Sequence, residues 1–268
     1  MTRVITLTTD FGTRDHFVAE MKGVILSINP RATIVDITHD VEKFNVVHGA
    51  FVLVCAYKWF PRGTIHVVVV DPGVGTSRRA ILIETERYYF VGPDNGVLAP
   101  AAARDGVRAI YDISDFREWE VSATFHGRDI FAPAAARLSL GEPPSSLGRR
   151  VSEFVRLDIF RASSSDGVVE GRVVHVDSFG NVITSIDVGH VRRAGFSYGD
   201  VLDVQVGRAR LRLRFLPAYG FAERGETLAL VNSEGFFEIA INASSAASAL
   251  GVKVGDPVVA RRARSARG

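Results

Sequence analysis

Cysteine is almost absent from this chain, with Cys55 alone among its 268 residues. A single thiol excludes both an internal disulfide and a metal site built from thiolates. The sequence also lacks any apolar run of about 18 residues, and no N-terminal stretch combines a basic start, an apolar core and a small-residue cleavage site. These absences predict a soluble, cytoplasmic protein whose chemistry does not depend on sulfur.

Lysine is scarce as well: four of the 32 basic residues are lysines, and the formal net charge is +2. Residues 261–268 carry four arginines and no acid, so the rest of the chain has a net charge of −2. A nucleic-acid binder usually presents a basic face, which the body of this chain does not supply. We therefore expect no nucleic-acid or membrane partner, and we expect residues 261–268 to form a disordered basic tail.

Four arginines alternate with apolar residues along 208–215. A period of two is typical of a strand with one buried face and one solvated face. A surface that binds bases needs aromatic side chains beside its arginines, and none lies on the arginine side of this segment. A solvated strand face is therefore the favoured interpretation.

Short apolar strands alternate with helical segments from residue 4 to about residue 160. This βαβαβ order predicts an α/β layer with a mainly parallel sheet and right-handed crossovers. Pro30 and Pro61 follow the two helices and end them. The expected strands are 4–9, 33–37, 64–70, 80–84 and 88–91, and the expected helices are 17–28 and 45–60.

Clusters of serine, glycine and proline at 141–148 and 163–167 mark loops or linkers. Beyond them the pattern changes to short strands separated by Gly, Asp or Asn turns, which predicts a small barrel or sandwich. The expected strands are 168–177, 181–187, 201–206, 208–215, 227–231, 236–241 and 257–260. We expect an N-terminal α/β domain at 1–160 and a smaller, all-β, barrel-like domain at 166–260.

The first strand runs directly into an acidic segment that contains Asp10 and Asp15. Ligands of open α/β sheets bind beyond the carboxyl ends of the strands, where Asp10 is placed to accept hydrogen bonds from a ribose diol. Alternatively, Asp15, or less readily Asp10, caps the helix that begins near His16.

The strand at 64–70 ends in a glycine-rich loop from Asp71 to Arg78. No lysine follows its glycines, as a P-loop requires, and Arg78 stands where a dinucleotide fingerprint needs a third glycine. The glycine turn allows Asp71 and Arg78 to face the same cavity. A structural ion pair between them is the alternative, and these two residues alone slightly favour it.

His126 precedes an expected helix that starts at Gly127, close to an electropositive N-terminus where imidazole tends to stay neutral. A neutral histidine can orient or deprotonate water, although a histidine in such a place is more often structural. The seven histidines show neither His-x-His nor His-x-x-x-His spacing. We therefore expect no catalytic metal.

In the second half, turns at 176–181 and 231–238 place acids, amides and an aromatic residue on loops. This combination suits a polar ligand with a flat ring. Each turn taken alone is better interpreted as an ordinary β-turn, which needs no ligand.

Six motifs occur in order: TDFG at 9–12, VDPGVGTSR at 70–78, GPDNG at 92–96, TFHGRD at 124–129, DSFGNV at 177–182 and NS at 232–233. With them the chain closely resembles, over nearly its whole length, the S-adenosyl-L-methionine hydrolases, or S-adenosyl-L-methionine hydroxide adenosyltransferases, relatives of the S-adenosylmethionine halogenases. The resemblance implies an α/β domain followed by a β-barrel, and hydrolysis of S-adenosyl-L-methionine to adenosine and L-methionine without metal or cofactor. It also implies homotrimers with each active site between the N-terminal domain of one subunit and the C-terminal domain of its neighbour.

The resemblance assigns roles by position. Asp71, Arg78 and His126 match the set that activates water for attack on the ribose C5′. Which of them takes the proton stays open, because three coupled groups can titrate as a unit. Asp10, with Asp15 nearby, matches the ligand of the ribose diol. The adenosine pocket is implied to contain Phe44, Phe179, Asn181, Phe221 and the backbone around Ala243, and the methionine end is implied to lie against Asp177, Ser233 and Glu238.

Two other functions are open. Halogenases of this family carry smaller or uncharged groups in place of Asp71 and His126, and a carboxylate there would repel a halide, so the sequence favours hydrolysis. A non-catalytic nucleotide- or RNA-binding module would show salt-sensitive RNA affinity and no turnover. It would leave Asp71, Arg78 and His126 unexplained.

Overall fold

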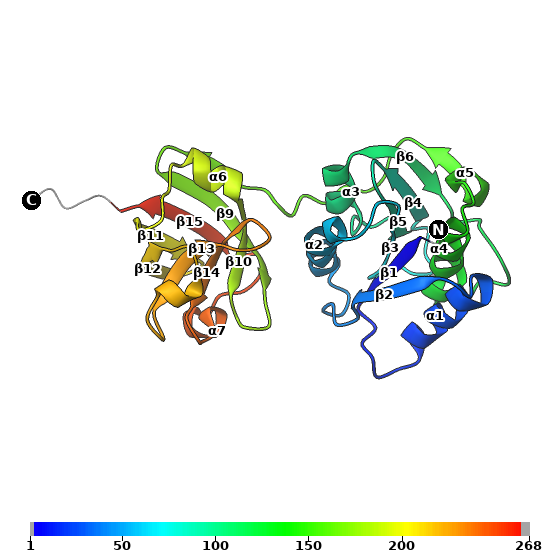
Figure 1. Cartoon of the computed structure of the whole chain (residues 1–268), viewed down its shortest axis with the longest axis horizontal. Coiled ribbons are helices and arrows are strands. Elements are labelled where there is room, and N and C mark those ends of the chain that lie inside the picture. The colour runs from blue at the N-terminus through cyan, green and yellow to red at the C-terminus, as the bar shows by residue number, and fades with distance from the viewer. Residues whose placement is uncertain (1–2, 264–268) are drawn as a thin grey trace, which may run out of the picture. The chain divides into compact units, whose positions relative to one another are not determined.

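The computed structural model describes residues 3–263. The chain divides into two compact units between Leu157 and Asp158, close to the boundary expected at residue 160 (Figure 1). None of the helices within the described range is long and apolar enough to cross a bilayer.

The N-terminal unit is built on a seven-stranded sheet in the order β2-β1-β3-β5-β4-β6-β7. β2, β1, β3 and β5 pair in parallel, whereas β4 and β7 run antiparallel to their neighbours, so five of the seven strands share one direction. The mainly parallel sheet is thus confirmed. The strands are β1 (Val4–Thr9), β2 (Thr33–Thr38), β3 (Ile65–Val69), β4 (Ala80–Thr85), β5 (Tyr89–Pro93), β6 (Val107–Asp112) and β7 (Arg149–Val151).

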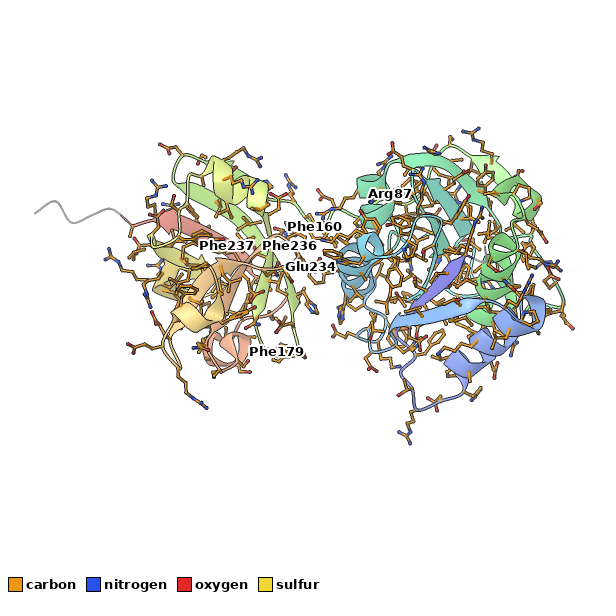
Figure 2. The ribbon with its side chains drawn as sticks, in the orientation of Figure 1. Arg87, Phe160, Phe179, Glu234, Phe236 and Phe237 are labelled. Carbon is orange, nitrogen blue, oxygen red and sulfur yellow. The ribbon has the colours of Figure 1, made fainter. Side chains whose placement is uncertain are left out.

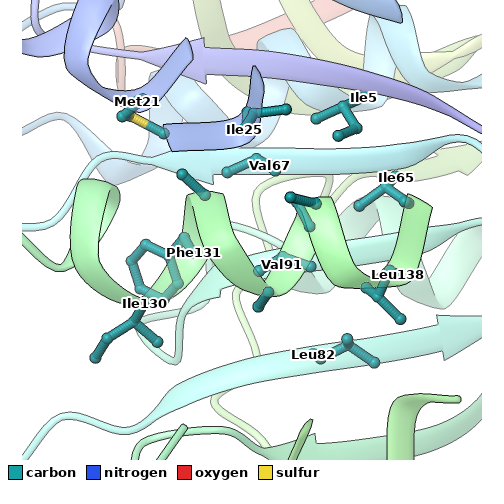
Figure 3. Close-up of a cluster of buried hydrophobic side chains, with 14 of the residues drawn as sticks. Ile5, Met21, Ile25, Ile65, Val67, Leu82, Val91, Ile130, Phe131 and Leu138 are labelled. Atoms are coloured by element: carbon teal, nitrogen blue, oxygen red, sulfur yellow. The ribbon is translucent and has the colours of Figure 1, made fainter. Parts of the chain in front are cut away.

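Helices cover both faces of this sheet, with α1 and α4 packed together on one face and α2 and α3 on the other (Figure 1). The helices and helical turns of this unit are α1 (Phe17–Ile28), α2 (Val46–Ala56), η1 (Tyr57–Trp59), α3 (Ala99–Asp105), η2 (Gly127–Phe131), α4 (Ala132–Ser139) and α5 (Pro144–Leu147). Figure 3 shows the core on the α1 and α4 face, where Met21, Ile25, Phe131 and Leu138 meet fully buried strand residues such as Ile65.

The helix expected from Gly127 begins as a wider turn. η2 is a π-helical turn, in which the Ala132 N–H donates to the Gly127 carbonyl, and the α-helical pattern of α4 begins only at Ala132. Pro133 has no N–H, so it cannot donate to the carbonyl of Asp129 as a regular α-helix requires. π-turns of this kind are frequent at functional sites.

The C-terminal unit is a barrel. Its strands follow the order β10-β14-β13-β12-β11-β15-β9, and β9 also pairs with β10 and closes the ring. β8 (Ser163–Ser165) adds to β9, and the barrel also carries α6 (Val188–Arg193), η3 (Tyr219–Phe221) and α7 (Ala246–Leu250). The strands of the ring are β9 (Val168–Val176), β10 (Val182–Asp187), β11 (Val201–Val206), β12 (Ala209–Phe215), β13 (Thr227–Val231), β14 (Phe236–Ile241) and β15 (Pro257–Arg262).

The arginines of β12 are exposed while Leu213 and Phe215 are buried, which confirms the solvated strand face. The prediction of a disordered tail over 261–268 is wrong at its beginning. Arg261 pairs with residues of both β11 and β9, and the Ala263 N–H donates to the Val201 carbonyl. Backbone pairing does not depend on side-chain charge, so an arginine pair can extend a strand. Residues 264–268 of the expected tail lie outside the described residues.

Candidate functional site

The topology of the N-terminal sheet opens a crevice beside β1. β2 lies on one side of β1 and β3 on the other, so the chain leaves β1 in one direction and returns on the opposite side. At such a switch point the connecting segments separate, and the carboxyl ends of the two strands face an open space. Thr9 of β1 is in register with Val69 of β3, which brings Asp10 and Asp71 to neighbouring strand ends.

Three side chains from two loops meet at this edge. Arg78 donates from Nε to Oδ1 of Asp71 over 3.1 Å and from Nη2 to Oδ2 of the same carboxylate. Its Nη2 also lies 3.0 Å from Nδ1 of His126. The pair of Asp71 and Arg78 is therefore part of a larger group that includes the histidine.

The chemistry of arginine determines the form of His126. A guanidinium has only N–H donors, so Nδ1 of His126 must accept and the neutral ring must carry its proton on Nε2. Burial and the positive charge of Arg78 lower the pKa of His126 below its usual 6.5. Both effects favour the neutral imidazole that the sequence led us to expect, and the free donor of this ring is Nε2.

The pKa of Asp71 is shifted in the opposite direction to that of His126. Its side chain is largely buried. Burial raises the pKa of Asp71 above its usual 3.8, although the charge and hydrogen bonds of Arg78 act against this rise. The carboxylate of Asp71 is therefore more basic than an exposed one, even with Arg78 beside it.

Asp71 and His126 line a cavity of about 380 Å³, here called the front cavity. Asp10, Asp15 and Phe44 line it too, so five of the six site residues predicted in this unit meet in one space. The sixth, Arg78, lies behind them and touches both Asp71 and His126. Phe11, Phe17 and Phe125 form an aromatic wall of the same cavity, with ring centroids 5.3–5.8 Å apart.

Asp10 is held rigidly at the cavity. It is 6% exposed, and its Oδ2 accepts the Phe44 N–H at 2.8 Å. Lys43 donates from Nζ to the Asp10 carbonyl. Neither acid caps α1: the N-cap residue is His16, and no side chain makes a capping hydrogen bond there.

Phe44 and Ala243 share an unusual backbone conformation. They are the two non-glycine residues with positive φ in the described range, at 64° and 60°. Left-handed backbone costs free energy in residues with a Cβ and concentrates at binding and catalytic sites. Both were predicted as ligand-binding residues, one in each unit.

The barrel carries a second cavity, of about 660 Å³, here called the barrel cavity. Asp177, Phe179, Asn181 and Ala243, four of the residues expected to bind the substrate, line it together. Asp177 also orders its own turn, since Oδ1 accepts the N–H groups of Phe179 and Asn181 at 2.9 Å. Phe179 is 78% exposed and projects outward near α7 (Figure 2).

Three further predicted residues do not line the barrel cavity. Glu238 is 1% exposed and accepts from the Tyr219 hydroxyl at 2.7 Å and from Asn232 Nδ2 at 3.0 Å. Burial raises the pKa of Glu238, and burial together with this hydrogen bond raises the pKa of Tyr219. Ser233 is exposed on the turn after Asn232, and Phe221 is 64% exposed at the end of η3.

Residues outside the predicted site set also contribute, in the barrel cavity and behind the front cavity. Tyr219 and Asn242 line the barrel cavity, and Tyr219 is the link between that cavity and the buried Glu238. Asn95 Nδ2 donates to the Val70 carbonyl at 2.8 Å and fixes the strand end before Asp71. The sequence holds a signal for each of these residues: Asn95 belongs to the GPDNG motif at 92–96, and Tyr219 lies two positions before Phe221. No group of three or more His, Cys, Asp or Glu suited to a metal occurs among residues 3–263.

Two family models match the chain. The model described as the SAM hydroxide adenosyltransferase N-terminal domain matches residues 5–148, and the corresponding C-terminal domain model matches residues 171–259. The two matches follow the two structural units.

Curated relatives of the chain carry two names, hydrolase and fluorinase. The chain is 38% identical over 265 residues to an (R)-S-adenosyl-L-methionine hydrolase of Methanocaldococcus jannaschii, covering 95% of this chain and 94% of the relative. It is 41% identical to one from Salinispora tropica (94% and 95%) and 30% identical to a fluorinase of Actinopolyspora mzabensis (94% and 95%). A crystal structure of an uncharacterized conserved protein from Thermotoga maritima is similar with a TM-score of 0.92 and 43% identity, covering 96% of this chain and all of that one.

The hydrogen bond between Arg78 and His126 predicts the tautomer of the ring in solution. Nitrogen-15 NMR of the imidazole should show an unprotonated Nδ1 and a protonated Nε2 at neutral pH, without titration until the pH falls below 6.5. In Arg78→Gln, the signals of His126 should titrate at higher pH, because the positive charge is gone. A protonated Nδ1 in the native protein would contradict the geometry.

Proposed function

Because the chain belongs to the SAM hydroxide adenosyltransferase family, we propose that it hydrolyses S-adenosyl-L-methionine to adenosine and L-methionine. The observation that carries the proposal is the group of Asp71, Arg78 and His126 at the switch point of the sheet. A basic carboxylate, a fixed cation and a neutral imidazole donor are what the activation of one water molecule needs.

The front cavity binds the nucleoside part of the substrate. The buried carboxylate of Asp10 has an acceptor for the ribose diol, and its position is fixed by the Phe44 N–H. Phe11, Phe17 and Phe125 exclude water from the opposite wall, which strengthens the electrostatic interactions of the reacting groups. Carbon C5′ then faces Asp71 and His126.

Asp71 is the proton acceptor in this mechanism. Nδ1 of His126 is already occupied by Arg78 and Nε2 carries the proton, so the neutral imidazole can donate to water but cannot take its proton. The raised pKa of Asp71 improves it as a base, since a base is most effective when its pKa approaches the working pH. His126 orients the water through Nε2, and Arg78 stabilises the charge that develops.

The reaction itself needs few catalytic groups from the protein. A sulfonium is a good leaving group. Most of the acceleration therefore comes from placing the attacking water in line with the C5′–S bond and from stripping that water of its hydration shell. The water oxygen forms a bond to C5′, the C5′–S electron pair goes to the sulfur of methionine, and the water proton goes to Asp71. No metal or redox step is required to balance these products.

Halide transfer is the related reaction, and the fluorinase relatives make it a real alternative. The carboxylate of Asp71 faces the front cavity at the position where the nucleophile must sit. Removing an anion from water and placing it beside a buried carboxylate is unfavourable. The geometry therefore favours neutral water over halide.

The barrel cavity supplies recognition of the amino-acid end in this proposal. Asp177 offers carboxylate oxygens for an ammonium group, and Tyr219, whose hydroxyl is oriented by Glu238, offers a hydroxyl oxygen. The exposed ring of Phe179 offers a stacking surface for adenine. Ser233 adds a hydroxyl on the adjacent turn. Recognition of the ribose and recognition of the amino-acid end thus lie in different units of the chain.

We further propose a homotrimer in which the front cavity of one copy and the barrel cavity of a neighbouring copy share one substrate. The family resemblance supports it, and so does the strong exposure of Phe44, Phe179 and Phe221, at 71%, 78% and 64%. Exposed aromatic residues of this kind commonly anchor interfaces and ligands.

Product analysis with a charge-neutral variant tests the reaction. The wild-type protein, supplied with S-adenosyl-L-methionine in both sulfonium configurations, should release adenosine and methionine in equal amounts. Asp71→Asn should lower kcat by about 10²–10⁴-fold, the usual contribution of a general base, while the Kd for adenosine changes little. Asp115→Asn, an exposed acid on another loop, is the control and should behave as wild type. Tight adenosine binding without any release of products by the wild type would refute the hydrolase assignment.

Mixed oligomers test the shared site. Asp71→Asn and Asp177→Asn each damage a different unit, so both homo-oligomers should be nearly inactive. Co-expressed copies carrying different tags should regain activity, because random assembly creates some sites with both native halves. Separately purified homo-oligomers, mixed only at assay, are the control. Mixed trimers as inactive as their parents would show that each site is built from a single copy.

A further inference from the structure

A further cavity of the N-terminal unit lies behind the group of Asp71, Arg78 and His126. This rear cavity has a volume of about 480 Å³, and its lining includes Thr76, Arg78, Ser114, Arg117, Glu120 and His126. Its lining is mainly polar, unlike the aromatic wall of the front cavity. A cavity of this volume with a polar lining has room for several water molecules.

The catalytic group forms the wall between the two cavities. Asp71 lines the front cavity, Arg78 lines the rear cavity, and His126 lines both. The rear side is also held firmly in place: the buried carboxylate of Asp129 accepts from Trp119 Nε1 at 3.0 Å and from the Ser122 N–H at 2.9 Å, which ties the loop of Arg117 and Glu120 to the turn after His126.

We propose that the rear cavity is the water site and proton exit of the enzyme, through which the nucleophile reaches the catalytic group while the substrate occupies the front cavity. The inference rests on the proposed hydrolysis. In-line displacement places the nucleophile on the side of C5′ away from the sulfur, which is the side of the catalytic wall. The bound substrate itself blocks access from the front, so replacement water comes past Arg78 and His126.

The same route removes the proton. One O–H bond of water breaks as the oxygen bonds to C5′, and Asp71 takes the proton. After the products form, Asp71 returns this proton to water that is hydrogen-bonded to Nε2 of His126, and the proton leaves through the rear cavity. Arg117 and Glu120 are exposed lining residues of that cavity, where bulk water exchanges.

Blocking the rear cavity from two lining positions tests the proposal. Ala123→Phe and Glu120→Trp each add a ring to an exposed lining residue that makes no contact with the front cavity. We expect kcat to fall by about tenfold or more in each, with an unchanged Kd for adenosine, because water supply becomes limiting while the substrate site is intact. Two blocking variants are used because either one alone could fail to fold, and the other would then still give a result.

Matched controls separate bulk and charge from blockage. Asp115→Phe adds the same ring to the same loop outside the cavity, and Glu120→Gln removes the charge without the ring; both should keep wild-type kcat. The proposal is overturned if the folded blocking variants keep kcat within about twofold, or if adenosine affinity falls together with kcat. A wild-type protein that releases no adenosine would instead refute the proposed function, and the route with it.

Discussion

The contact on which the site depends is the three-way junction at Arg78. Its guanidinium binds both oxygens of Asp71 and, through the same Nη2, the Nδ1 of His126. One cation thereby does two things: it keeps the imidazole neutral in a defined tautomer, and it moderates the rise in pKa that burial imposes on the carboxyl. Without Arg78, the proton could sit on either the buried acid or the histidine, and neither group would have a defined role.

The fold makes this junction possible by bringing distant segments to one edge. β1 and β3 lie side by side with Asp10 and Asp71 at their ends. Gly75 packs so closely on the Ala123 carbonyl that a Cβ would lie 2.3 Å from it, and this contact joins the Asp71 loop to the segment before His126. The π-turn that follows His126 then ties that segment to α4, whose apolar side is part of the core.

The sequence predicted the α/β domain, the barrel and most of the site residues, because strand ends and ordered motifs mark where ligands bind in α/β sheets. Periodicity predicted β1, α1, β2 and the barrel strands. It missed β6 and the short β7, in which polar residues such as Arg108 and Arg150 weaken the strand pattern. Tyr219 was missed because its partner Glu238 lies on a strand far along the chain. The disordered tail was wrong at Arg261 because its pairing partners in β9 and β11 are set by tertiary structure, which composition does not encode.

The central claim is that water activated by Asp71 attacks carbon C5′, and the fate of the water oxygen tests it most directly. A single turnover in heavy-oxygen water, followed by mass spectrometry of both products, should place the label in the 5′ hydroxyl of adenosine and leave methionine unlabelled. Adenosine without the label, or a label in methionine, would contradict displacement at C5′ and with it the assignment of Asp71, Arg78 and His126.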